Sequence, residues 1–238
     1  MHRSDFLQQI LLITDGCSNE GADPVNVAKI AARQGISVNV IGVIDDGVLG
    51  KKGEREVADI AVAGNGMYRF TKASDLSKTM QYMTQHSMEI SIERAAVSRW
   101  GLSEYQTVEH LPPEFRPTIA RAVEEAVEYA FLDVCLVIDQ SGSMNPKQTY
   151  VIGAVRDLVH ALSSRTGKYR MDTIVFPDIK GGTVRHLLVP PLRLADAIGK
   201  IAPQGNTPTG PALALAIQTL KMGLSNNTHQ KRSSVYVG

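Results

Sequence analysis

The chain has 238 residues, of which 43% are hydrophobic and only 5% aromatic, so its core must be built from aliphatic side chains. Twenty-five Lys and Arg residues against 24 Asp and Glu give a formal net charge of +1, without long runs of like charge. This balance argues against binding to nucleic acid or to anionic lipid. Neither a membrane span nor a leader is expected. Two distant cysteines, Cys17 and Cys135, do not form a disulfide framework, so we expect a cytoplasmic protein.

Residues 1–90 alternate short apolar runs with segments of helical period. This pattern is typical of strands and crossover helices in a mainly parallel sheet. Several of these predicted strands and helices end at a Gly residue or at an Asp-Gly pair. The predicted strands are 10–14, 36–44 and 67–70, and the predicted helices are 24–34, 54–63 and 74–90. The segment therefore predicts one half of an α/β domain.

Residues 91–130 have a different character. Pro112, Pro113 and Pro117 interrupt the pattern before apolar residues at helical spacing resume between Ile119 and Val127. We predict a connector that contains one helix.

Residues 131–224 return to the α/β pattern and predict the other half of the domain, and 225–238 read as a loose tail in which only 235–237 have strand character. A turn-rich segment between two apolar runs predicts a hairpin, which places one antiparallel strand at the sheet edge. The predicted strands are 132–138, 172–176 and 184–189, and the predicted helices are 151–162, 194–201 and 211–220. The fold class is therefore α/β, a doubly wound, mostly parallel six-stranded sheet with helices on both faces.

Three loop segments carry small oxygen-bearing side chains. They are Asp139-x-Ser141-x-Ser143 after a strand, Thr207 in a Gly-Asn-Thr turn, and Asp15 after the first strand. In open α/β sheets, ligands bind at the edge formed by such loops. Carboxylate and hydroxyl oxygens suit Mg²⁺, or Mn²⁺ in its place, and do not suit zinc. Thr209 is the alternative to Thr207 as the threonine ligand.

These residues resemble the metal-ion-dependent adhesion site of von Willebrand factor A domains, whose motif is Asp-x-Ser-x-Ser, then a Thr, then an Asp. Asp139, Ser141, Ser143, Thr207 and Asp15 stand at the matching places. The Asp comes first here rather than last, so the chain is similar to the circularly permuted members of the family in spore-forming bacteria. The resemblance implies a Mg²⁺-dependent binding module, with Asp15 acting through water and the acidic side chain of a partner protein completing the ion's shell.

Two other functions remain open. A phosphohydrolase could use Asp139 as its nucleophile, but Ser141 stands where such enzymes place a general acid. A scaffold could dock through the connector or the tail without using a metal. We expect a binding module rather than an enzyme, acting as an adaptor in a bacterial assembly; the sequence leaves the partner and the oligomeric state open.

Overall fold

The computed structural model describes residues 6–44, 50–101, 108–178 and 184–233, with side chains described as far as residue 223. The strand character expected at 235–237 lies outside these residues. In the described ranges, no helix is long and apolar enough to cross a membrane.

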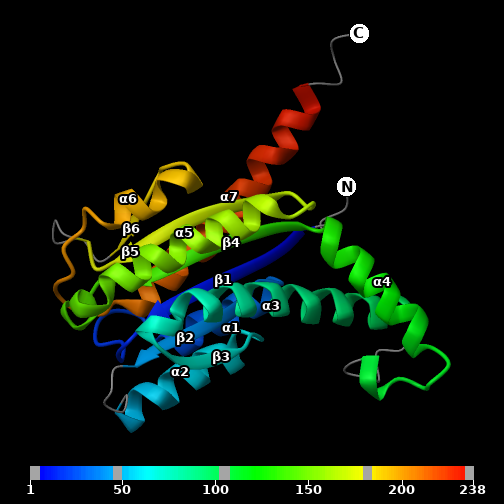
Figure 1. The fold of residues 1–238 in the computed structure, drawn as a ribbon, viewed down its shortest axis with the longest axis horizontal. Coiled ribbons are helices and arrows are strands. Elements are labelled where there is room, and N and C mark those ends of the chain that lie inside the picture. Colours follow the sequence, from blue (N-terminus) through cyan, green and yellow to red (C-terminus); the bar gives the residue numbers. More distant parts are fainter. Residues whose placement is uncertain (1–5, 45–49, 102–107, 179–183, 234–238) are drawn as a thin grey trace.

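A single six-stranded sheet forms the centre of the molecule (Figure 1). Its strands are β1 (Phe6–Thr14), β2 (Ser37–Ile44), β3 (Tyr68–Lys72), β4 (Phe131–Asp139), β5 (Tyr169–Phe176) and β6 (Arg185–His186). They lie in the order β3-β2-β1-β4-β5-β6, all parallel except β6, which pairs antiparallel with β5. The predicted fold class is therefore confirmed, although β6 has two residues where the sequence predicted a strand over 184–189.

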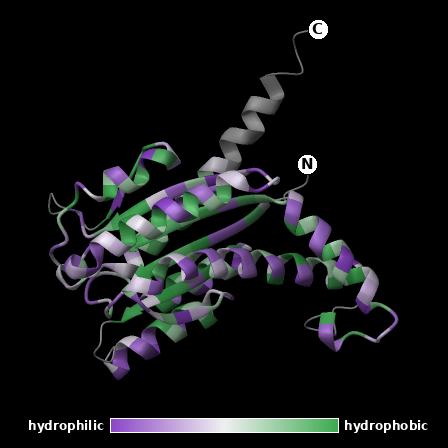
Figure 2. Cartoon of the chain, viewed as in Figure 1, coloured by the Kyte–Doolittle hydropathy of each residue, from purple (hydrophilic) through white to green (hydrophobic). Residues whose placement is uncertain are grey.

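Helices cover both faces of the sheet. One face carries α3 (Leu76–Arg99), α5 (Gln148–Ser164) and α6 (Leu194–Ile198), and the other carries α1 (Pro24–Arg33), α2 (Lys51–Ala63) and α7 (Thr209–Ser233). Along β1, Leu11 and Ile13 join the first core and Ile10 and Leu12 join the second, because successive side chains of a strand point to opposite faces. Figure 2 shows hydrophobic residues concentrated on the strands, as expected for a sheet buried on both sides.

Local sequence signals explain where the helices begin and end. Asp23 caps α1 by accepting a hydrogen bond from Val25 N at 3.0 Å, and Pro24 follows it at the first helical position. Gly35, at φ +77°, ends the same helix. The helix predicted over 151–162 lies within α5, and the apolar residues at helical spacing from Val151 to Leu162 are buried.

The predicted domain boundaries fall inside helices. Helix α3 continues past residue 90 to Arg99, and α7 continues past residue 224 to Ser233. Neither segment contains a proline, so nothing in the sequence ends the helix at the predicted boundary, and α3 keeps buried residues, Ile92 and Val97, beyond it. The connector contains the predicted helix, α4 (Arg116–Tyr129), and a small apolar cluster of Val97, Leu111 and Ile119 joins α4 to the end of α3.

The central pair of strands determines where the candidate site forms. Strands β1 and β4 are parallel neighbours, and Ile13 pairs with Ile138. Thr14 and Asp139, the last residues of the two strands, therefore stand beside each other at the carboxyl edge. Residues far apart in sequence meet there, at the point where the strand order reverses direction.

Candidate metal centre

Asp139 is held at the carboxyl end of β4 and is completely buried. Thr14 Oγ1 donates a hydrogen bond to Asp139 Oδ2 at 2.7 Å, and Ser141 N donates to Asp139 Oδ1 at 2.8 Å. Both carboxylate oxygens therefore have fixed directions.

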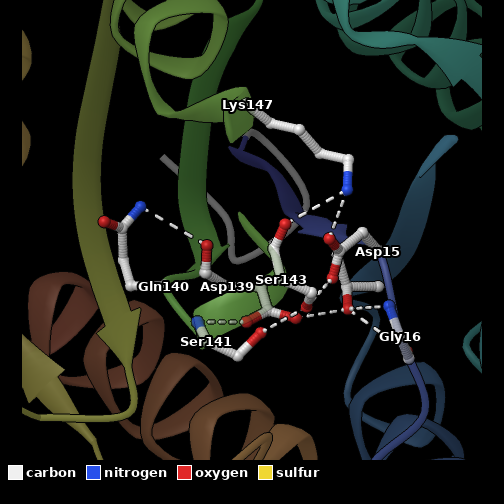
Figure 3. Close-up of polar contacts among 8 residues, drawn as sticks. Asp15, Gly16, Asp139, Gln140, Ser141, Ser143 and Lys147 are labelled. Atoms are coloured by element: carbon white, nitrogen blue, oxygen red, sulfur yellow. Dashed lines mark hydrogen bonds and ion pairs between the residues drawn. The ribbon is translucent and has the colours of Figure 1, made fainter. Parts of the chain in front are cut away.

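Ser141, Ser143 and Asp15 continue the same network (Figure 3). The Ser141 and Ser143 hydroxyl oxygens lie 3.2 Å apart, and Ser143 Oγ donates to Asp15 Oδ1 at 2.7 Å. Ser143 and Asp15 are 128 positions apart in the chain. Four of the five residues predicted from the sequence thus lie together, linked by hydrogen bonds from Asp139 to Asp15.

Thr207 is tied to this edge through its backbone. Its N–H donates to Asn19 Oδ1 at 2.8 Å, and Asn19 N donates back to Thr207 O at 3.2 Å. Gln204 N donates to Gln140 O at 2.8 Å, which joins the same turn to the residue after Asp139. The turn that carries Thr207 is therefore connected to both of the other loops.

Two buried oxygen atoms near this edge have no hydrogen-bond partner within the described part of the chain. They are Thr209 Oγ1 and Gln140 Oε1, on residues that are each 1% exposed. A buried polar atom without a partner costs roughly 1–3 kcal/mol, so such atoms point to a bound ion or water. The carboxylate and hydroxyl set, with Thr209 Oγ1 two residues after Thr207, fits a hard divalent cation at this edge, whereas Gln140 Oε1 points away from that set (Figure 3). The choice between Thr207 and Thr209 stays open.

Lys147 is a component of the site that the sequence did not reveal. Its Nζ lies 2.6 Å from Asp15 Oδ2 and donates to Ser143 O at 3.2 Å. Both side chains are buried, at 5% and 2% exposure. The only signal in the sequence is a basic residue four positions after Ser143, at the end of the 3₁₀ turn Gly142–Lys147.

The protein groups around Asp139 disfavour its ionised form. Burial raises the pKa of its carboxyl group from 3.8 to about 6, against the lowering effect of the hydrogen bonds from Thr14 and Ser141. The nearby Asp15 carboxylate also raises this pKa. A cation at this position would stabilise the ionised form.

The loops at this edge approach each other so closely that one glycine has no room for a side chain. A Cβ on Gly210, near the start of α7, would collide with the backbone of Ala22, next to the loop that follows Asp15. We therefore expect Gly210→Ala to lower the free energy of unfolding by about 1–2 kcal/mol, as measured by urea denaturation. Gly153 in α5 has open space around it, so Gly153→Ala should raise this free energy by about 0.5–1 kcal/mol. Equal effects of the two changes would contradict the close contact.

Comparisons with known proteins agree with this architecture. The family model of the von Willebrand factor type A domain matches residues 2–86. YabS of Bacillus subtilis (strain 168), described as uncharacterized, is 38% identical over 212 residues, which cover 87% of this chain and 86% of YabS. The crystal structure of an uncharacterized protein from Alicyclobacillus acidocaldarius is 35% identical with a TM-score of 0.85, covering 95% of this chain and 98% of that one.

The part of the chain that matches the von Willebrand factor type A domain, residues 2–86, contains β1, β2, β3 and the loop that carries Asp15. The chain belongs to the same protein family as YabS.

Proposed function

We propose that the protein is a Mg²⁺-dependent protein-binding module whose ion sits at the carboxyl edge of β1 and β4. The observation that carries this proposal is the continuous hydrogen-bonded set of Asp139, Ser141, Ser143 and Asp15. It brings together, from both halves of the chain, the oxygen ligands that Mg²⁺ or Mn²⁺ prefers.

Each residue has a defined part in this site. Asp139, Ser141, Ser143 and Thr207 would hold the ion directly or through water, and Asp15 would act through a water molecule. The bound ion supplies a Lewis-acidic position that an Asp or Glu of a partner protein can occupy. Thr14 fixes the Asp139 carboxylate through its hydrogen bond, and Asn19 fixes the turn that carries Thr207.

We also propose that the domain is circularly permuted. Suppose that the chain order of the two halves is exchanged, so that strands 4, 5 and 6 become 1, 2 and 3 and the reverse. The sheet order 3-2-1-4-5-6 then becomes 6-5-4-1-2-3, which is the same order read from the other edge of the sheet. A permuted chain can therefore keep the sheet while its Asp15 segment comes before its Asp139 segment. The strand order and the position of Asp15 directly after β1, the neighbour of β4, support this arrangement. The connector 91–130 would then join the original ends.

The geometry favours binding over catalysis. Both Asp139 oxygens accept hydrogen bonds and the residue is completely buried, which suits a fixed ligand better than an attacking nucleophile. We propose an adaptor in a bacterial multi-protein assembly, acting in the cytoplasm on a protein partner. Phosphatase turnover that requires Mg²⁺ and disappears in Asp139→Asn would overturn this proposal.

A titration with Mg²⁺ or Mn²⁺, followed by thermal unfolding, tests the proposed site. An ion at about 100 times its Kd stabilises the folded state by about 2.7 kcal/mol, which raises the Tm of a chain of this size by roughly 5–10 °C. Ser141→Ala should lose most of this increase because it removes a proposed ligand. Ser98→Ala, at an exposed position of α3, should keep it.

The outcome that contradicts the site is a wild-type Tm that does not change with either ion. A Tm increase that Ser141→Ala retains in full would place the ion elsewhere. The scaffold alternative makes a different prediction, because its partners would remain bound both in the presence of a chelator and in Asp139→Ala.

A further inference from the structure

A buried lysine contacts the proposed metal site from the side of Asp15. Lys147 Nζ is 2.6 Å from Asp15 Oδ2, while Asp15 Oδ1 accepts the hydrogen bond from Ser143. The same ammonium group donates to Ser143 O. Because both Lys147 and Asp15 are almost fully buried, solvent screens this ion pair little. The ammonium group of Lys147 is therefore a fixed part of the site.

Lys147 changes the charge that a divalent ion meets. With Asp139 and Asp15 ionised, the two carboxylates and the ammonium group together carry one negative charge rather than two. A bound Mg²⁺ leaves the site with one positive charge, which a single carboxylate from a partner balances. Without Lys147 the loaded site would already be neutral. Uncompensated charge is costly in buried surroundings, so this difference affects how strongly the ion is held.

We propose that Lys147 is a resident counter-ion that lowers the affinity of the site for divalent cations. The ammonium group repels the incoming ion and engages the Asp15 carboxylate that the ion also needs. The inference rests on the proposed function and adds an element that regulates the same site. It implies that the ion is held less tightly than the two carboxylates would hold it alone.

The test is calorimetric titration of the full chain with Mn²⁺ alone. We compare the wild type with Lys147→Met, which removes the charge and keeps the length, and Lys147→Gln, which can still donate a hydrogen bond to Asp15. Either variant suffices if the other does not fold. Lys221→Met is the matched control, because Lys221 is exposed on α7 next to Leu220, whose carbonyl contacts Arg170 near the opposite edge of the sheet.

We expect both Lys147 variants to bind Mn²⁺ at least about tenfold more tightly than the wild type, and Lys221→Met to bind as the wild type does. Without metal, the Lys147 variants should melt at a lower temperature, because Asp15 then lacks its counter-ion. A lysine that served only to support the structure would not produce tighter metal binding.

The remaining outcomes separate this inference from the proposed function. If the wild type binds Mn²⁺ and the Lys147 variants bind it equally or more weakly, the proposed role of Lys147 is overturned and the metal site remains supported. Binding by the variants alone supports the inference and overturns Mn²⁺ binding as a property of the natural chain. Binding by none of the proteins overturns both.

Discussion

Asp139→Asn is expected to make the metal-free protein more stable at pH 7.5 while abolishing its stabilisation by Mg²⁺. The Asp139 carboxyl group has a pKa of about 6 in the folded protein against 3.8 as its ordinary value, because it is buried. Folding therefore disfavours the ionised group. Asparagine removes that charge, and its amide can still accept from Ser141 N and donate to Thr14 Oγ1.

The pH dependence of this effect follows from the sign of the shift. At pH 4 the group is protonated in the folded protein and only partly ionised in the unfolded chain, so the substitution should change the stability by less than about 1 kcal/mol. As the pH rises from 3.8 to 6, the unfolded chain ionises first, and the wild type loses up to about 3 kcal/mol relative to the variant. Above pH 6 the difference should remain constant. Imperfect hydrogen bonding by the amide reduces the expected gain to about 2 kcal/mol.

Urea denaturation with a chelator present, at pH 4 and at pH 7.5, measures this difference. Asp59→Asn is the matched control, because Asp59 is exposed in a surface pair with Arg55 and should change the stability by less than about 0.5 kcal/mol. An Asp139→Asn protein that is less stable than the wild type at pH 7.5 would show that the carboxylate is stabilised in the metal-free site.

Arg170→Met is expected to lower the free energy of unfolding by about 3–5 kcal/mol, the largest effect that we predict. Asp133, on β4, is 1% exposed, and Arg170 Nε and Nη2 donate to its two oxygens at 2.8 and 2.6 Å. Burial raises the pKa of Asp133, and Arg170 acts against that rise. Removing the guanidinium group leaves a buried carboxylate without its cation and also removes a contact to Leu220 O on α7.

Two comparisons make this prediction specific. Arg193→Met breaks an exposed pair with Asp196 and should cost less than about 0.5 kcal/mol. The double variant Arg170→Met, Asp133→Asn should recover part of the loss because it removes the unpaired charge. A loss below about 1 kcal/mol in Arg170→Met would contradict the proposed importance of the pair. Since this pair joins the amino-terminal parts of β4 and β5, the response to Mg²⁺ should not change.

The fold could be predicted from the sequence because its signals are local. Apolar runs such as Val134–Ile138 mark strands buried on both faces, and the stripe from Val151 to Leu162 marks a helix with one buried face. Buried polar contacts are a different case. Asn39 Nδ2 donates to Gln9 Oε1 and to Ser87 Oγ, both at 2.9 Å, and no sequence pattern predicts that these three residues meet.

The candidate site could be predicted only in part, because some of its contacts join residues that are distant in the sequence. The motif residues were identified by their type and by their positions after strands. Thr14, Asn19 and Lys147 contribute through contacts that depend on the register of β1 against β4 and on how the loops pack. The side chain of Asn19, for example, binds a backbone N–H 188 positions away, which only the folded chain brings near.

The central position of β1 has a consequence for biosynthesis. The ribosome releases β1, β2 and β3 well before β4, whose pairing with β1 covers the middle of the sheet. At roughly 5–20 residues per second, the more than one hundred residues between β1 and β4 take several seconds or longer to emerge. During that interval the nascent chain exposes an open, aliphatic strand edge of the kind that promotes aggregation. We therefore expect truncated chains that end before Phe131 to depend on chaperones for their solubility.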